Sequence, residues 1–168
     1  MRKKIADKLI MNRFQDQRKR IDFFEHEFLV RCPHCQSCAV IFPTEPQNTD
    51  LFSPRRFSCK KCGASKDWSG RIVRRSWRNN PVDIYFQIPL WLQTACCGET
   101  LWAYNSSHLE FIEHFVQADL REHKFDDHYG WSNKSLFSRL PKWIQSRNNR
   151  HAILKAIAKL HQLEQFSD

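Results

Sequence analysis

The stretches Cys32-Pro33-His34-Cys35 and Cys59-Lys60-Lys61-Cys62-Gly63 decide how this chain folds. In each stretch, two cysteines lie three positions apart. Their sulfurs can turn toward one point when the backbone between them forms a tight loop, here called a knuckle. A glycine directly after the second cysteine suits the positive-φ position that closes such a loop. Two knuckles supply four thiolates, the tetrahedral shell that suits Zn²⁺, at about 2.3 Å per bond.

The sequence around the knuckles is typical of a zinc ribbon, a small β-module whose strands lead into each knuckle. Short β-like runs cover residues 27–31, 39–42, 55–58 and 71–73, with a turn-rich insert at 43–54. A β-module with so little core needs a metal in order to fold. We therefore predict one structural Zn²⁺, whose four ligands leave no open position for water: Cys32, Cys35, Cys59 and Cys62.

Other interpretations of these cysteines are buried free thiols or a redox dithiol, although two pairs without a thioredoxin-like βαβ pattern favour metal. Cys35 and Cys38 form another possible pair. We prefer Cys32 with Cys35, because Pro33 and the strand-like run before it frame that knuckle. Gln36 follows Cys35 where Gly63 follows Cys62, so the first knuckle departs from the second at this position.

The adjacent Cys96 and Cys97 require a separate interpretation. Neighbouring side chains of a strand point to opposite faces, so such a pair rarely chelates one metal. We predict that one lies in the core and the other at a turn. A second metal site with His108 or His114 and a reactive thiol are the alternatives.

Composition narrows the class of protein. Of 168 residues, seven are cysteine, an odd number that does not suit a secreted disulfide scaffold. No long apolar run follows the basic start, and no eighteen apolar residues run together, so we predict a cytoplasmic protein without a membrane span. The four glycines are too scattered for a phosphate-binding loop, so no nucleotide cofactor is expected.

The sequence predicts an α+β fold in three parts. Residues 1–25 have apolar side chains at roughly helical spacing and predict a basic N-terminal helix. Residues 26–80 form the zinc ribbon. Residues 81–168 begin with a β-hairpin whose strands, 90–94 and 100–104, flank a turn at Gly98. A helix follows, started by a capping box of Ser107 and Glu110 and extending to Leu120. Short helices near 134–140 and after Pro141 lead to a last helix capped by Asn149.

Charge is unevenly distributed along the chain, whose formal net charge is +9. Residues 26–80 hold ten basic and four acidic residues, a balance of +6, whereas residues 105–130 hold two and six, a balance of −4. Basic side chains interleaved with an aromatic suit nucleic acid, because cations bind phosphates and rings stack on bases. A solvated strand that pairs with acids of this chain or of a partner is the alternative. The predicted nucleic-acid-binding residues are Lys60, Lys61, Arg71, Arg74, Arg75, Trp77 and Arg78.

One stretch carries residue types that catalysis could use. Asp119, Glu122, His123, Asp126, Asp127, His128 and Asn133 could hold a divalent ion for phosphodiester cleavage. In an HNH nuclease, however, the catalytic residues lie between the zinc cysteines, whereas these follow the last ribbon cysteine at a distance. The plainer interpretation is a helix end that runs into a polar loop, and we assign no catalytic residue.

The 32–63 pattern resembles the transcription-factor-IIB-type ribbon and the zinc motifs of primosomal helicases. Three further stretches resemble bacterial zinc-ribbon proteins of a largely uncharacterised family: residues 90–105 with His108-Leu109, then Ser138-Arg139-Leu140-Pro141, and Arg147-Asn148-Asn149-Arg150. That resemblance implies a ribbon protein but no settled activity. We therefore expect a non-enzymatic zinc protein that binds DNA or RNA. An adaptor that docks on a larger nucleic-acid-processing or defence complex is the alternative, and a metal-dependent nuclease is the weaker third.

Overall fold

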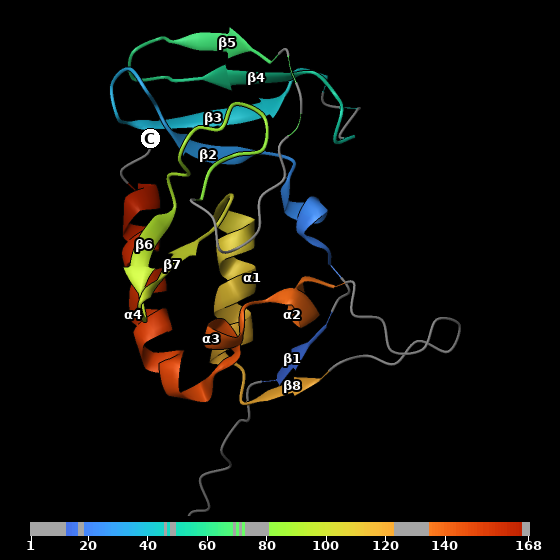
Figure 1. Ribbon diagram of the computed structural model, residues 1–168, viewed down its shortest axis with the longest axis vertical. Helices are drawn as coiled ribbons and strands as arrows, with labels where there is room; N and C mark the ends of the chain where they lie inside the picture. The colour runs from blue at the N-terminus through green and yellow to red at the C-terminus, as the bar shows by residue number, and fades with distance from the viewer. Residues whose placement is uncertain are drawn as a thin grey trace, which may run out of the picture.

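A computed structural model describes residues 13–16, 19–45, 47, 50–68, 70, 72, 81–122 and 135–165. The fold is α+β, with a four-stranded antiparallel sheet at one end of the molecule and the longer helices α1 and α4 below it (Figure 1). A small β-hairpin and a two-stranded parallel sheet complete the lower part. No helix in these described ranges is long and apolar enough to cross a bilayer.

The four-stranded sheet carries both knuckles. Its order is β2 (Phe28–Arg31), β3 (Cys38–Pro43), β4 (Arg55–Ser58) and β5 (Ser65–Asp67), each antiparallel to the next. The runs predicted at 27–31, 39–42 and 55–58 are thus confirmed as strands. Strand β5 has three exposed residues and no apolar one, so only its pairing with β4 identifies it. Of the predicted run 71–73, residues 71 and 73 lie outside the described residues.

The hairpin ties the sheet to the rest of the molecule. Strands β6 (Gln93–Cys96) and β7 (Glu99–Trp102) flank a turn at Cys97 and Gly98, as predicted. Backbone hydrogen bonds join β2 to the residues just before β6 and just after β7. The Leu29 N–H donates to the Tyr104 carbonyl at 2.8 Å, and the Trp91 N–H donates to the Leu29 carbonyl at 2.9 Å. One buried core therefore runs from the sheet into the helices.

The helices follow the predicted order: α1 (Ser106–Gln117), α2 (Leu136–Arg139), α3 (Lys142–Gln145), the 3-10 turn η2 (Arg147–Asn149) and α4 (Arg150–Gln165). Helices α1 and α4 pack together, and the predicted inward residues Leu109, Ile112 and Ile157 are buried. The expected cap of α1 is wrong. Asn105, not Ser107, begins the helix, because its side chain accepts the His108 N–H at 3.0 Å.

The predicted N-terminal helix is wrong wherever the structure describes it. Strand β1 (Arg13–Gln15) pairs in parallel with β8 (Leu120–Glu122), and only one 3-10 turn, η1 (Ile21–Phe24), follows. The Phe14 side chain packs edge-on against Phe111 of α1 at 5.4 Å, while the two residues beside it are exposed. This alternation is that of a strand, whose partner is about a hundred residues away in sequence. Residues 1–12 lie outside the described residues.

Candidate metal centre

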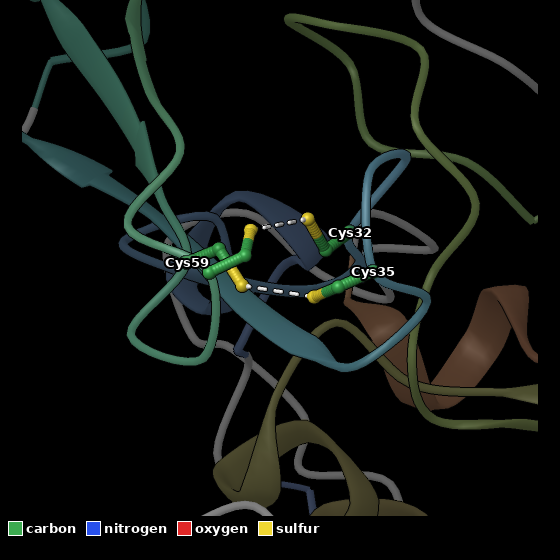
Figure 2. Close-up of side chains that lie close together, drawn as sticks. Cys32, Cys35 and Cys59 are labelled. Carbon is green, nitrogen blue, oxygen red and sulfur yellow. Dashed lines mark hydrogen bonds between the residues drawn. The ribbon is translucent and has the colours of Figure 1, made fainter.

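The structure brings the four predicted cysteines together at one end of the sheet. Their Sγ atoms all lie within 4.8 Å of one another. Cys32 Sγ is 3.7 Å from Cys62 Sγ, and Cys35 Sγ is 3.6 Å from Cys59 Sγ. Figure 2 shows the sulfurs of Cys32 and Cys35 on one loop facing the loop that carries Cys59. A tetrahedron with metal–sulfur bonds of 2.3 Å has edges of about 3.8 Å, so the spacing fits Zn²⁺.

The two knuckles repeat one hydrogen-bond pattern. In the first, the Cys32 N–H donates to the Ser37 carbonyl and the Gln36 N–H donates to the Cys32 carbonyl, at 2.8 and 2.9 Å. In the second, the same bonds join Cys59 with Ala64 and Gly63 with Cys59, again at 2.8 and 2.9 Å. The residue after each second cysteine is left-handed, with φ of 61° at Gln36 and 74° at Gly63. Gln36 therefore adopts the conformation that glycine has in the second knuckle.

Burial divides the cluster into an inner and an outer half. Cys32 and Cys59 are 0% and 1% exposed and belong to the buried core, whereas Cys35 is half-buried and Cys62 is exposed. The inner cysteines come directly after β2 and β4, so the sheet positions them. A metal held here lies at the surface of the molecule but is tied to its core.

The thiols of the cluster do not ionise alike. Hydrogen bonds from the Ser37 backbone and side chain lower the pKa of Cys35 to about 6. At Cys62 the Ala64 N–H favours the thiolate, but desolvation and the three neighbouring sulfurs outweigh it and raise the pKa to about 12. When no cation is present, a thiolate at one cysteine of the cluster therefore makes ionisation of a neighbouring thiol less favourable. A divalent cation removes this repulsion, so the donor set suits Zn²⁺.

The remaining cysteines lie outside the cluster. Cys38 opens β3 and does not join it, which agrees with the choice of Cys32 and Cys35. Cys96 is buried at the end of β6, and Cys97 is exposed in the turn, as predicted. Within the described ranges, the four ribbon cysteines are the one group of three or more His, Cys, Asp or Glu side chains close enough to share a metal. A second metal site with His108 or His114 is not found there.

The predicted nucleic-acid-binding residues are described only in part. Lys60 and Lys61 lie in the second knuckle and are exposed. The sequence did not single out Lys66, whose side chain is exposed on β5, the outer strand that pairs with β4. The positive net charge of residues 26–80 was the signal that could have pointed to it. Arg56 of β4 pairs with Asp67 at 2.6 Å, so its charge is partly neutralised. Five predicted residues lie outside the described part of the chain: Arg71, Arg74, Arg75, Trp77 and Arg78.

The stretch considered for catalysis is likewise described only at its start. Asp119 follows α1 and forms an ion pair with Arg150 of α4, at 3.0 Å. Glu122 ends β8. The residues of this set that lie outside the described ranges are His123, Asp126, Asp127, His128 and Asn133. The described geometry therefore assigns Asp119 to an ion pair that joins the segment after α1 to α4.

Comparison with protein-family models, with curated proteins and with solved structures finds no match for this chain. The resemblance to ribbon families thus stays a prediction, carried by the motifs quoted above. The four-cysteine cluster marks the chain as one that can hold a metal ion at the end of its antiparallel sheet.

Proposed function

We propose that this chain is a non-enzymatic zinc-ribbon protein that binds nucleic acid through the basic outer surface of the ribbon. The observation that carries the proposal is the four-sulfur cluster, whose sulfur–sulfur distances of 3.6 and 3.7 Å match a tetrahedral thiolate shell. Four thiolates complete the coordination of Zn²⁺, so the metal is structural. Reduced thiols of this kind persist in a reducing compartment, which is why we place the protein in the cytoplasm.

The metal centre is tested by elemental analysis of the full chain. We expect one zinc per chain, and loss of that zinc in Cys59→Ser, because the variant removes a buried ligand. Cys38→Ser is the matched control, since this half-buried cysteine lies nearby but outside the cluster, and it keeps the zinc. A folded wild-type chain without zinc would overturn the assignment. Equal zinc loss in the two variants would show a general effect of cysteine removal.

Charge supports nucleic acid as the partner. The ribbon region carries ten basic against four acidic residues, and the exposed residues of the second knuckle include two adjacent lysines, Lys60 and Lys61. The metal closes this knuckle, so it also orders the backbone that presents these lysines. Each phosphate contact releases counterions, so such binding weakens as salt rises. The arginines of residues 71–78 lie outside the described residues, and the proposal includes them for their charge.

A salt titration of binding tests this partner with short single- and double-stranded DNA and RNA. We expect the double variant Lys60→Ala with Lys61→Ala to reduce the slope of log K against log salt by about 1 for each lost contact. Arg74→Ala with Arg75→Ala is expected to act in the same direction. The control is Lys155→Ala with Lys159→Ala, which removes equal charge from exposed positions of α4. Equal effects of ribbon and control pairs would contradict a ribbon surface.

Docking on a partner protein is the second candidate, and one observation favours it. Phe52, within the insert between β3 and β4, is 71% exposed, and exposed aromatic side chains are common anchors of protein interfaces. If the zinc-loaded chain retains no oligonucleotide at low salt, nucleic-acid binding is wrong. Co-purification of a defined complex that Phe52→Ser abolishes would then establish the adaptor.

A further inference from the structure

The adjacent cysteines of the β6–β7 hairpin are closer in space than a strand allows. Neighbouring strand side chains point to opposite faces, yet Cys96 Sγ and Cys97 Sγ are 3.6 Å apart. The cause is the backbone, because Cys96 is the last residue of β6 and Cys97 already belongs to the turn, with φ of 55°. The turn therefore directs both sulfurs to the same side.

The turn sequence is unusual for this backbone. Cys97 and Gly98 are both left-handed, with φ of 55° and 78°, as in the two-residue turns that connect hairpins. Asn or Asp followed by glycine suits such a turn, whereas other side chains are strained at its first position. Cys97 is exposed, so burial of its sulfur does not offset the strain. Gln36 and Gln87 are also left-handed, so what sets this turn apart is the approach of the two sulfurs rather than the strain alone.

The two thiols differ in access. Cys97 is exposed and can meet a reagent from solution, whereas Cys96 is 8% exposed and lies at the end of β6, a strand that packs against α4. Burial also raises the pKa of Cys96 to about 11, so little of this thiol is ionised near neutral pH. The arrangement is that of an attacking thiol with a resolving thiol beside it.

We propose that Cys96 and Cys97 form a reversible oxidation site that reacts with peroxides and closes to a disulfide between neighbouring residues. The Cys97 thiolate attacks one oxygen of hydrogen peroxide; a sulfur–oxygen bond forms, the oxygen–oxygen bond breaks, and hydroxide leaves and is protonated to water. The Cys96 sulfur then attacks the Cys97 sulfur. The sulfur–sulfur bond forms, the sulfur–oxygen bond breaks, and a second water leaves. Two thiols are oxidised, and one peroxide is reduced to two waters.

This disulfide is readily reduced. Consecutive Cα atoms are held about 3.8 Å apart by a trans peptide, below the range of about 4.4–6.8 Å in which disulfides are relaxed. Strained and exposed disulfides are the labile ones. The site is also separate from the ribbon, because neither cysteine belongs to the four-sulfur cluster. Its oxidation leaves the proposed metal ligands unchanged.

The test uses the full zinc-loaded chain, treated with one equivalent of hydrogen peroxide, alkylated and digested with trypsin. Cleavage after Lys and Arg releases residues 79–121 as one peptide, whose cysteines are Cys96 and Cys97 alone. We expect this peptide to lose two hydrogens and to regain them with dithiothreitol. We expect the disulfide to form within one chain faster than between chains, because the two sulfurs are already adjacent. In Cys97→Ser the peptide forms no internal disulfide, whereas Cys38→Ser behaves as wild type.

Three results would overturn the proposal. In the first, the peptide 79–121 stays reduced while the cysteines of residues 26–80 react. Oxidation could stop at sulfinic acid without an internal disulfide. A non-reducing gel could show dimers joined through Cys97, which would make the pair an intermolecular thiol. The zinc content of the treated protein is measured in parallel, so that failure of the metal assignment is seen separately.

Discussion

The position after the second cysteine of each knuckle gives the sharpest prediction. Both Gln36 and Gly63 are left-handed, with φ of 61° and 74°, and both loops carry the same hydrogen bonds. Gln36→Gly is therefore expected to strengthen the metal centre, and Gly63→Gln is expected to weaken it. Space does not decide the second effect, because a Cβ added at Gly63 meets nothing within 4 Å. Backbone strain is therefore the main difference between the two positions.

The magnitude follows from two opposing terms. A left-handed residue other than glycine is strained by about 1–2 kcal/mol. Glycine avoids this strain, but it costs roughly 0.4–1 kcal/mol of stability, because a chain with glycine loses more conformational entropy when it folds. Each substitution is thus worth about 1 kcal/mol, with opposite signs. At Gln36 a weak bond from its Nε2 to the Pro33 carbonyl, at 3.4 Å, is also lost, so the gain there is the smaller of the two.

Competition for Zn²⁺ against a chromophoric chelator measures this effect, because the knuckle conformation is completed as the metal binds. A change of 1 kcal/mol corresponds to about a fivefold change in affinity. The exchanged variant, Gln36→Gly with Gly63→Gln, is the control and should return close to wild type. If Gln36→Gly weakens zinc binding as much as Gly63→Gln does, the strain argument is refuted.

The remaining predictions concern the core and its histidines. Asn105 donates to the Phe24 and Glu27 carbonyls and accepts from the His108 N–H and the Ser107 hydroxyl. At about 1 kcal/mol per bond, Asn105→Ala should lower the free energy of unfolding by about 4 kcal/mol in urea denaturation; a loss below 1 kcal/mol would contradict this. Complete burial lowers the pKa of His108 to about 3. The neutral ring therefore contributes stability that is full above the unfolded value near 6.5 and is lost as pH falls toward 3. NMR should show no titration of this ring down to pH 4 and should place its proton on Nε2, because Nδ1 accepts the Tyr104 N–H. Desolvation lowers the pKa of His161, but hydrogen bonds to Glu164 and Glu113 outweigh it, so the pKa is raised. The protonated ring therefore contributes stability that is full below about 6.5 and is lost as pH rises through the raised pKa. Glu113→Gln should lower this pKa in the same NMR titration.

Much of the four-stranded sheet and its cysteine cluster could be predicted from local sequence. The spacing of Cys32, Cys35, Cys59 and Cys62 identifies a four-sulfur cluster, because each knuckle needs only residues that adjoin its own cysteines. The strand runs beside the knuckles follow from the same local pattern of apolar and polar residues. Strand β5 escapes this logic, since three exposed polar residues carry no pattern and are ordered by β4 alone.

Two features depended on contacts between distant segments. Phe14 fits a helical period as well as a strand, and its partners Phe111 and Phe115, together with β8, decide for the strand. Asn105 is the helix cap rather than Ser107, because the carbonyls of Phe24 and Glu27 hold its side chain in place.

By itself, the sequence determined the four-cysteine cluster, strands β2 to β4, the hairpin turn and the order of the helices. These depend on short-range geometry, which residue type and spacing carry. Only the tertiary structure decided the N-terminal strand, the left-handed Gln36 and the approach of Cys96 to Cys97. In the first case the partner is remote along the chain. In the other two a single backbone dihedral reverses where a side chain points, and no pattern of residue types reports that angle.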